Sequence, residues 1–421
     1  MTGNMKGGVS VPREGHVSLE DLNWEFGYST DEGSLHLFTE EENRFRLEFR
    51  EFVRREALPV VDRIDREKNF DLIHEVVRKM GRAGYIGVSF PREVGGWGKG
   101  LVHQVIVGEE LSAASYAVAV TYGASAVLYA MPIVRFGTRE QKENFLKPIM
   151  TGDELGAIAI TEPTGGSDAI GGMQTRAVKK GSHYVINGEK RFITNGSRAK
   201  YILLYAVTNP DVKRHQGISA FIVPTDTEGF KVVKDYELLG RLGSVNSHLV
   251  FKDCKVPEEN LLGEENGGLR VLMEGLDSER TFTSSQYVGI ARSAFEIATK
   301  YAAERVQFRR PIREFEGVSF KIADMYANIE AARLMVLRAA RMIDSGLNAT
   351  REVAAAKFFS ADVAVKVCLD AVQIAGGIGM TKEYPLERYL RDSKMGQIGA
   401  GTSEVLRYLV QREIYRKVAG G

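Results

Sequence analysis

The chain has 421 residues, of which 44% are apolar, and its 56 basic residues nearly balance 55 acidic ones to give a formal net charge of +1. This length allows roughly two or three domains of an ordinary globular protein, and the balanced charge argues against a polyelectrolyte partner. The basic residues are not gathered into long runs with interleaved aromatics, so nucleic-acid binding is not expected.

The cysteines and the N-terminal segment bear on the compartment. Cys254 and Cys368 lie far apart and lack a metal-ligand spacing, which favours a reducing compartment and argues against a structural zinc or a disulfide framework. We find no apolar stretch that approaches the ~18 residues needed to span a bilayer. Residues 1–37 have neither a signal-peptide apolar core nor an Arg-rich transit pattern. We therefore expect a cytoplasmic protein with an N-terminal extension over residues 1–37.

The next part of the chain has helical periodicity. Thr39-Glu-Glu-Glu42 has the Thr-x-x-Glu form of a capping box, which predicts the start of the first helix. Apolar residues at helical spacing continue through Leu72–Met80, Val105–Leu111 and Glu140–Met150. We predict an α-helical domain over residues 38–154.

From about Leu155 the periodicity changes. Short segments such as "ELGAIAI", "AKYILLYAV" and "GISAFIVP" are rich in β-branched and aromatic residues and are bounded by turn-forming residues. Asn187-Gly188 predicts a tight hairpin turn, because both positions tolerate positive φ. We predict a compact β domain over residues 155–267.

Helical periodicity returns after Gly267-Gly268. Leu269, Leu272 and Leu276 fall on one stripe of the first helix. Later segments, such as 322–343 and 353–374, are too apolar to be isolated surface helices. We predict an α-helical bundle over residues 268–421, and hence a mainly α fold with a central β domain.

Three segments are candidate binding elements. Ile160–Asp168 follows a predicted strand and presents hydroxyls and N–H groups on a Gly-containing loop, as an anion or a polar ring edge requires. Phe192 and Thr194 project to one face of a strand, which suits stacking and hydrogen bonding to a planar heterocycle. Gln373–Gly379 has more glycines than one helix C-cap needs, as close approach of a backbone or a phosphate would explain. A plain loop, a core aromatic and a helix cap are the alternative interpretations.

Glu279 is the most informative single residue. It shares the apolar stripe of Leu272 and Leu276 at ~3.6 residues per turn. A carboxylate on an apolar face must be paired or have a raised pKa. An ion pair with a nearby arginine is therefore the alternative to a catalytic role, although Arg280 points about 100° away.

Five motifs, taken in this order, resemble the acyl-CoA dehydrogenase family of flavoproteins: "ITEPTGGSD", "INGEKRFITNG", "FKDCKVPEENLLG", "YAAERVQF" and "QIAGGIGMTKEYPLERYLRD". The resemblance runs from about Phe38 to Lys417. It implies an N-terminal α-helical domain, a β-barrel-like middle domain and a C-terminal four-helix bundle, assembled as a homotetramer that is a dimer of dimers. It also implies FAD bound between the β domain and the bundle.

The resemblance places the FAD contacts on two subunits. Phe192 would stack near the isoalloxazine, where most relatives have Trp, and Thr194 would approach its N5. A hairpin and a glycine pair contributed by a partner subunit would hold the adenosine and pyrophosphate half, and Thr402 would close the site beside the flavin. The cofactor-binding residues expected in this way are Ile160, Thr161, Gly166, Ser167, Phe192, Ile193, Thr194, Arg305, Gln307, Phe308, Gln373, Gly376, Gly377, Thr402 and Glu404.

The chemistry that the resemblance implies is α,β-dehydrogenation of an acyl-CoA thioester. A carboxylate takes the α-proton while the β-hydride moves to the flavin, and an electron-transferring flavoprotein later removes the electrons. Because the α-carbon is a very weak acid, the thioester oxygen must be hydrogen-bonded in a dry pocket. In the family, a backbone N–H of the turn that reads Ile398–Val405 here is one of the donors.

The resemblance also decides between two positions for the base. In many family members the turn carries a Glu that acts as the base, and here that position is Ala400, which keeps only its backbone N–H. An isovaleryl-type branch instead has the base within Leu-Asp-x-Glu-Arg on the first bundle helix, and this chain has that motif at Leu276–Arg280. The expected catalytic residues are therefore Glu279, with a pKa raised by burial, and Ala400 through its backbone.

Small residues in the turn bear on the substrate. Gly399 stands where straight-chain enzymes have Tyr, and Gly396 where isovaleryl enzymes have Tyr, so the lost volume predicts a branched, cyclic or aryl-substituted acyl group. Arg338 matches a family position near the CoA moiety, with a solvated bundle arginine as the alternative. The expected substrate-binding residues are Ser167, Arg280, Arg338, Gly396, Gly399 and Gly401. Arg309 and Arg310 depart from the family pattern without an assigned purpose.

Other activities on the same scaffold stay open. They are an acyl-CoA oxidase, a flavin-dependent monooxygenase and an enoyl-CoA reductase. Because a monooxygenase needs no α-proton base, the Leu276–Arg280 motif argues against it. From another class, the chain could be a catalytically idle CoA-binding or assembly protein, with Ala400 as the mark of lost function.

Overall fold

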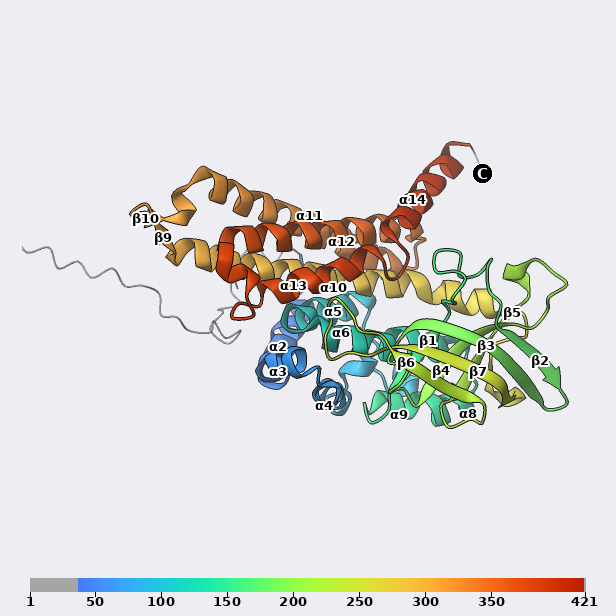
Figure 1. Ribbon diagram of the computed structural model, residues 1–421. Helices are drawn as coiled ribbons and strands as arrows, with labels where there is room; N and C mark the ends of the chain where they lie inside the picture. Colours follow the sequence, from blue (N-terminus) through green and yellow to red (C-terminus); the bar gives the residue numbers. More distant parts are fainter. Residues whose placement is uncertain (1–36, 420–421) are drawn as a thin grey trace, which may run out of the picture.

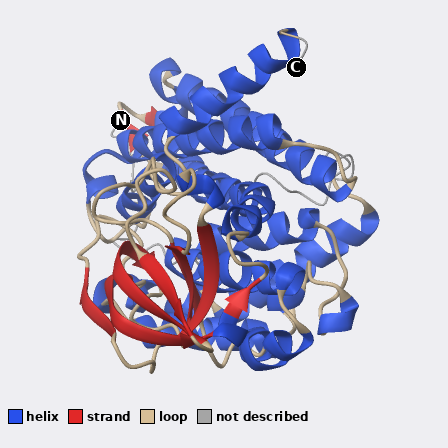
Figure 2. Ribbon diagram, turned by 90° about the vertical axis from the view of Figure 1, so that its right-hand side faces the viewer, coloured by secondary structure: helices blue, strands red, loops and turns tan. Residues whose placement is uncertain are grey.

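The computed structural model describes residues 37–419, so nearly all of the predicted N-terminal extension lies outside the described residues. Within the described part, long helices form one layer, shorter helices lie against them, and a sheet lies beside the shorter helices (Figure 1). Figure 2 shows the sheet gathered on one side of the molecule. The order along the chain, helices then strands then helices, is the order that the changes of periodicity predict.

The N-terminal helices form the shorter-helix group. α2 (Glu40–Glu56) begins at a capping box in which the Thr39 hydroxyl accepts from the Glu42 N–H and the Glu42 carboxylate accepts from the Thr39 N–H, which confirms the predicted start. α5 (Leu101–Ala114) is buried along its whole length. The remaining helices are α3 (Val61–Glu67), α4 (Phe70–Arg82), α6 (Tyr116–Tyr122), α7 (Met131–Phe136), α8 (Arg139–Gln141) and α9 (Lys147–Met150).

The middle region folds into one sheet with the order β6-β7-β3-β2-β4-β5-β8, and β1 pairs with β4 in parallel. Its central strand β4 is almost wholly buried, which explains the near-continuous apolar run "YILLYAV". The strands are β1 (Gly156–Ala159), β2 (Arg176–Lys180), β3 (His183–Thr194), β4 (Tyr201–Val207), β5 (Ile218–Pro224), β6 (Phe230–Asp235), β7 (Asn246–Pro257) and β8 (Leu261–Leu262).

The hairpin turn predicted at Asn187-Gly188 is wrong. β3 runs through both residues, and the chain reverses between β2 and β3 instead. The Asn187 side chain is held by Asp253 on β7, since its Nδ2 donates to Asp253 Oδ1 at 3.2 Å and its Oδ1 accepts from the Asp253 N–H at 2.8 Å. A β-carbon at Gly188 would lie 2.4 Å from the Thr175 hydroxyl oxygen. Glycine is needed here for close approach of another strand end, not for a turn.

The C-terminal region is the layer of long helices that the sequence predicts. α10 (Gly268–Glu304) crosses the whole molecule and contacts both the shorter helices and the other long helices. A two-stranded hairpin follows it at the end of the layer remote from the sheet (Figure 1). The elements are α11 (Glu316–Asp344), α12 (Thr350–Ala375), α13 (Leu386–Ser393), α14 (Ser403–Val418), β9 (Val306–Gln307) and β10 (Arg310–Pro311).

A buried ion network joins the shorter and the long helices. Arg292 on α10 contacts Glu109 at 3.0 Å and Glu110 at 2.9 Å, both on α5. Arg50 on α2 contacts Glu110 at 2.9 Å, and Arg333 on α11 contacts Glu109 at 3.0 Å. All five side chains are buried, so each charge depends on the others for compensation.

Two helical stretches are long and apolar enough to cross a membrane by length and composition, Tyr116–Phe136 and Thr350–Met380. The expectation that no stretch meets this test is therefore wrong. In the described structure the most apolar window of the first stretch is 89% buried and that of the second is 50% buried. Both stretches contribute to the protein's own core, where an apolar helix is equally expected.

Gly289 sets the approach of α10 to α5. A β-carbon there would lie 2.2 Å from the Glu109 carbonyl oxygen and 2.4 Å from the Ser112 hydroxyl oxygen. We expect Gly289→Ala to lower the free energy of unfolding by about 1–3 kcal/mol, because the backbones must move apart. Gly275→Ala on the same helix is the control, since a β-carbon there meets nothing within 4 Å. Urea unfolding of both variants tests this, and equal effects would contradict it.

Candidate functional site

Glu279 lies on α10 and is only 6% exposed. Its Oε1 accepts from the Thr283 hydroxyl at 3.2 Å, and its Oε2 has no hydrogen-bond partner among the described residues. Burial raises the pKa of Glu279, while the positive charges of Arg280 and Lys357 act in the opposite direction. Since no salt bridge involves it in the described part of the chain, the ion-pair interpretation is not supported. The free, basic oxygen of a desolvated carboxylate is what a general base needs.

One buried lysine holds the turn that precedes α14. Lys357 on α12 is fully buried, and its Nζ donates to the carbonyl oxygens of Gly396, Gly399 and Gly401 at 2.7, 2.6 and 2.6 Å. Burial lowers the pKa of Lys357 to about 8. Three donors on one ammonium thus satisfy three carbonyls at once. Sequence reasoning missed this residue, because a lone lysine in a helical stretch gives no sign of what it faces.

The same contacts leave one backbone donor free. Ala400 has φ +56, a left-handed conformation that is unusual for alanine, and its carbonyl accepts from Arg280 Nε at 3.2 Å. Lys357 and Arg280 donate to carbonyl oxygens of the turn, whereas the Ala400 N–H donates to no acceptor in the described residues. Strained backbone of this kind persists where its surroundings fix it, often at functional sites. Lys357 and Arg280 also act on the pKa of Glu279, so the carboxylate and the turn are neighbours.

The extra volume expected beside the turn is occupied. A β-carbon at Gly396 would lie 2.9 Å from the ring of Tyr287, and one at Gly399 would lie 2.5 Å from the Met395 methyl carbon. Neighbouring side chains therefore lie against both glycines, and a branched, cyclic or aryl-substituted acyl group stays a prediction from the sequence. A Gly401 β-carbon would lie 3.6 Å from Arg280 Nη2, so this residue stays beside the site.

The loop after β1 is anchored by a buried pair. Glu162 accepts from Lys190 Nζ at 2.9 Å and from the N–H groups of Gln174 and Thr175 at 2.6 and 2.9 Å. Lys190 Nζ also donates to the Ile160 carbonyl at 3.0 Å. Glu162 and Lys190 were not among the predicted site residues, and they fix the loop that carries the predicted ones. In this loop Gly166 and Ser167 are exposed and Thr161 is half-buried.

The end of β3 presents one exposed aromatic. Phe192 has φ +59 at an irregularity in the pairing of β3 with β7, and it is 59% exposed. Its ring lies 4.9 Å from that of Tyr236. Ile193 instead points into the core of the sheet at 3% exposure, so only its backbone could contact a cofactor. Thr194 follows, and its hydroxyl accepts from Arg241 Nη1 at 2.9 Å.

The residues predicted for the adenosine half lie elsewhere. Arg305, Gln307 and Phe308 belong to the β9–β10 hairpin, which Figure 1 shows at the end of the long helices remote from the sheet. A single chain therefore does not bring them to Phe192. Phe308 is 88% exposed. The predicted residues Gln373, Gly376 and Gly377 are also exposed, and a β-carbon on either glycine would meet nothing within 4 Å.

Three further predicted residues, and Arg310, have defined surroundings. Thr402 is the N-cap of α14 and accepts from the Val405 N–H at 3.3 Å, while Glu404 is exposed in the first turn. The Arg338 side chain is 67% exposed and its Nη2 lies 3.7 Å from Glu352 Oε1, as expected of a solvated bundle arginine. Arg310, which had no assigned purpose, lies over the Phe315 ring at 4.1 Å from its centroid.

The comparisons with known proteins agree with this geometry. Three family models match the chain in order: acyl-CoA dehydrogenase N-terminal domain over residues 39–153, middle domain over 157–254 and C-terminal domain over 266–415. The chain belongs to the acyl-CoA dehydrogenase family. This makes it a flavoprotein oxidoreductase of an FAD-dependent family.

Individual relatives match over nearly their whole length. An acyl-CoA dehydrogenase of Bacillus subtilis is 43% identical over 374 residues, which are 89% of this chain and 98% of the relative. Subunit CarC of the caffeyl-CoA reductase–Etf complex of Acetobacterium woodii is 39% identical over 381 residues, 90% of this chain and all of the relative. The solved structure of butyryl-CoA dehydrogenase from Megasphaera elsdenii has a TM-score of 0.86 at 38% identity, covering 90% of this chain and 99% of that one.

Lys357→Met tests the support of the turn. We expect turnover to fall about tenfold or more and stability to fall by about 1–3 kcal/mol, because three buried carbonyls lose their donor. In the wild type, turnover should decline as pH rises through the Lys357 pKa of about 8, since the neutral amine donates one hydrogen bond fewer. This limb should be absent from the pH profile of the variant. Lys366→Met, which removes an exposed lysine of the same helix, is the control.

Proposed function

We propose that this protein catalyses the α,β-dehydrogenation of an acyl-CoA thioester to the enoyl-CoA and passes the electrons to an electron-transferring flavoprotein. The observation that carries the proposal is that two groups without a hydrogen-bond partner, one acceptor and one donor, occur at the same site. Glu279 Oε2 lacks a donor and the Ala400 N–H lacks an acceptor among the described residues, and the two cations that hold the turn also act on Glu279. A base and an oxyanion donor are what removal of a weakly acidic α-proton requires.

The residues divide the work as follows. The Ala400 N–H donates to the thioester oxygen as it gains enolate character, and Glu279 takes the α-proton. Lys357 and Arg280 hold the turn so that its N–H keeps its direction. When bound, FAD supplies the acceptor of the β-hydride. The burial of Glu279 and its neighbours excludes water, which strengthens these hydrogen bonds.

The chain's residues fit FAD, with the site shared between two subunits. Phe192, exposed and held in a left-handed conformation, offers a stacking face, and Gly376 and Gly377 leave open space for a phosphate. Ser167 and the exposed hairpin around Phe308 complete the set. Because these groups lie at opposite ends of one chain, we propose that FAD is bound between subunits of a homotetramer, a dimer of dimers. A cytoplasmic location stays a prediction from the sequence.

A reductase is the second candidate, since one relative is named as a subunit of the caffeyl-CoA reductase–Etf complex. The two directions use the same groups. The proposal is tested by recording the visible spectrum of the purified protein and adding acyl-CoA thioesters anaerobically. We expect a yellow protein whose flavin absorbance is bleached by one class of thioester and restored by an electron-transferring flavoprotein. A protein without flavin, or reoxidation by oxygen as fast as by that acceptor, would contradict it.

A further inference from the structure

Arg241, in the loop between β6 and β7, is a buried guanidinium without a carboxylate partner among the described residues. It is 4% exposed, and the hydrogen bond from Nη1 to Thr194 Oγ1 is the side-chain bond that the described structure gives it. Other buried arginines, such as Arg292 and Arg333, each contact Glu109. A buried cation without a counter-charge is unfavourable unless something else compensates it.

The backbone of Arg241 is fixed against α13. Its φ is +49, its N–H donates to Asp392 Oδ1, and a β-carbon on Gly240 would lie 2.5 Å from the Arg391 carbonyl oxygen. The Asp392 carboxylate bonds to the backbone N–H and makes no salt bridge with the Arg241 guanidinium in the described part of the chain. Burial raises the pKa of Asp392 to about 6.

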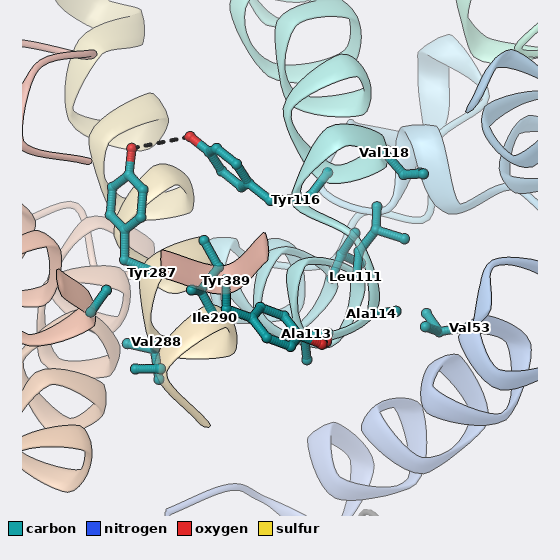
Figure 3. Packing of buried hydrophobic residues seen from close by; sticks show 14 of the residues in the cluster. Val53, Leu111, Ala113, Ala114, Tyr116, Val118, Tyr287, Val288, Ile290 and Tyr389 are labelled. Carbon is teal, nitrogen blue, oxygen red and sulfur yellow. Dashed lines mark hydrogen bonds between the residues drawn. The ribbon is translucent and has the colours of Figure 1, made fainter. Parts of the chain in front are cut away.

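Two tyrosines connect Arg241 to the catalytic groups. The Tyr116 and Tyr287 hydroxyl oxygens lie 3.3 Å apart, and Figure 3 shows the two rings reaching toward each other from α6 and α10. The Tyr287 ring is also the group that fills the space beside Gly396 in the turn. The charges of both Arg241 and Glu279 act on the pKa values of these tyrosines, which burial raises. The two hydroxyls therefore lie near both the arginine and the base.

We propose that Arg241, assisted by the hydroxyls of Tyr116 and Tyr287, receives a carboxylate at the far end of the acyl chain, so that the substrates are dicarboxylic acyl-CoA thioesters. This proposal rests on the proposed function. A guanidinium fork matches a carboxylate in shape and charge, and the tyrosine hydroxyls add further donors. A ligand carboxylate would give the buried guanidinium the salt bridge that the described residues do not give it. Because burial leaves the guanidinium poorly solvated, an acyl chain that ends in a methyl group would be rejected.

The test uses the FAD-loaded, full-length protein and pairs of thioesters with equal carbon number, one ending in a methyl group and one in a carboxylate. We expect wild-type kcat/KM for anaerobic flavin reduction to favour the dicarboxylic member by about 100-fold or more. Arg241→Leu should reverse the preference, and Arg241→Lys should keep part of it. Equal loss of activity toward both classes in Arg241→Leu, or a wild type that prefers the methyl-ended member, would overturn the proposal.

A binding measurement makes the test independent of turnover. In Glu279→Gln, with Arg241 intact, the shift of the flavin spectrum gives the Kd of each thioester without reaction. Tighter binding of the dicarboxylic member supports the role of Arg241 even if its variants fail to fold, and equal Kd values contradict it. If neither class reduces the wild-type flavin, the proposed function fails. If only methyl-ended thioesters reduce it, that function stands and the assignment of Arg241 fails.

Discussion

Glu279→Gln is expected to slow flavin reduction by the substrate thioester about 10²–10⁴-fold, because the amide cannot take the α-proton. The rate is measured by anaerobic stopped-flow mixing of the FAD-loaded protein with the thioester. Binding should persist, since glutamine keeps the shape of the side chain and its Oε1 can still accept from Thr283. Asp277→Asn is the control: this carboxylate lies on the same helix but accepts from the Thr350 hydroxyl at 2.8 Å. A similar loss in both variants would contradict the assignment.

The same variant has an expected pH signature. Burial raises the pKa of Glu279 above its ordinary 4.5, so wild-type activity should fall as pH drops through the raised value, and this limb should disappear in Glu279→Gln. A carboxyl group whose pKa is raised in the folded protein contributes stability at pH values below its unfolded-state pKa. This contribution is lost as pH rises through its folded-state pKa. Above the raised pKa the wild type therefore carries a buried charge at a cost. There the variant should have the higher Tm, and a lower Tm at every pH would contradict this.

Arg292→Met is expected to lower the free energy of unfolding by about 3–5 kcal/mol, because it leaves three buried glutamates, Glu109, Glu110 and Glu296, short of a partner. Arg292 donates to Glu109 at 3.0 Å and to Glu110 at 3.0 and 2.9 Å, and Arg50 and Arg333 would remain to compensate them. Urea unfolding at fixed protein concentration measures the change. Arg270→Met removes an exposed pair with Glu274 on the same helix and should cost less than about 1 kcal/mol.

The pH dependence of this loss also has a defined sign. The neighbouring arginines lower the pKa values of Glu109 and Glu110 despite their burial. Lowered pKa values contribute stability above the unfolded value of 4.5, and that stability is lost as pH falls toward the folded values. The gap between wild type and Arg292→Met should therefore be widest near neutral pH and narrow below pH 4.5. A gap that does not change with pH would mean that lost packing, not charge, destabilises the variant.

Local patterns predicted much of the fold. The capping box at Thr39 and Glu42 depends on residues three apart, and the change from helical to strand periodicity near Leu155 is a property of neighbouring side chains. The turn predicted at Asn187-Gly188 was wrong because contacts with distant residues, not local patterns, decide the structure there. A pair of residues that often forms a turn can also lie within a strand when tertiary contacts favour it. Here Thr175 approaches Gly188 closely, and Asp253 bonds to the Asn187 side chain.

The candidate site was predicted only in part. The apolar stripe on α10 indicated that Glu279 would be buried, and the structure agrees. Lys357 and Arg241 were missed, because the partners of each lie far along the chain: carbonyls of the turn for Lys357, and Thr194 for Arg241. The prediction from Gly396 depends on tertiary contacts in the same way. A sequence shows which side chain is missing from a position, but not that the Tyr287 ring lies against it.

The central claim is that Glu279, on α10, removes the α-proton while the turn offers only its backbone. The most direct measurement is exchange of the α-hydrogen of a bound substrate thioester with D2O, followed by mass spectrometry in the absence of an electron acceptor. We expect the wild type and Asp277→Asn to catalyse exchange and Glu279→Gln to lose it while still binding FAD and thioester. Exchange at the wild-type rate in Glu279→Gln would show that another group is the base and would contradict the account.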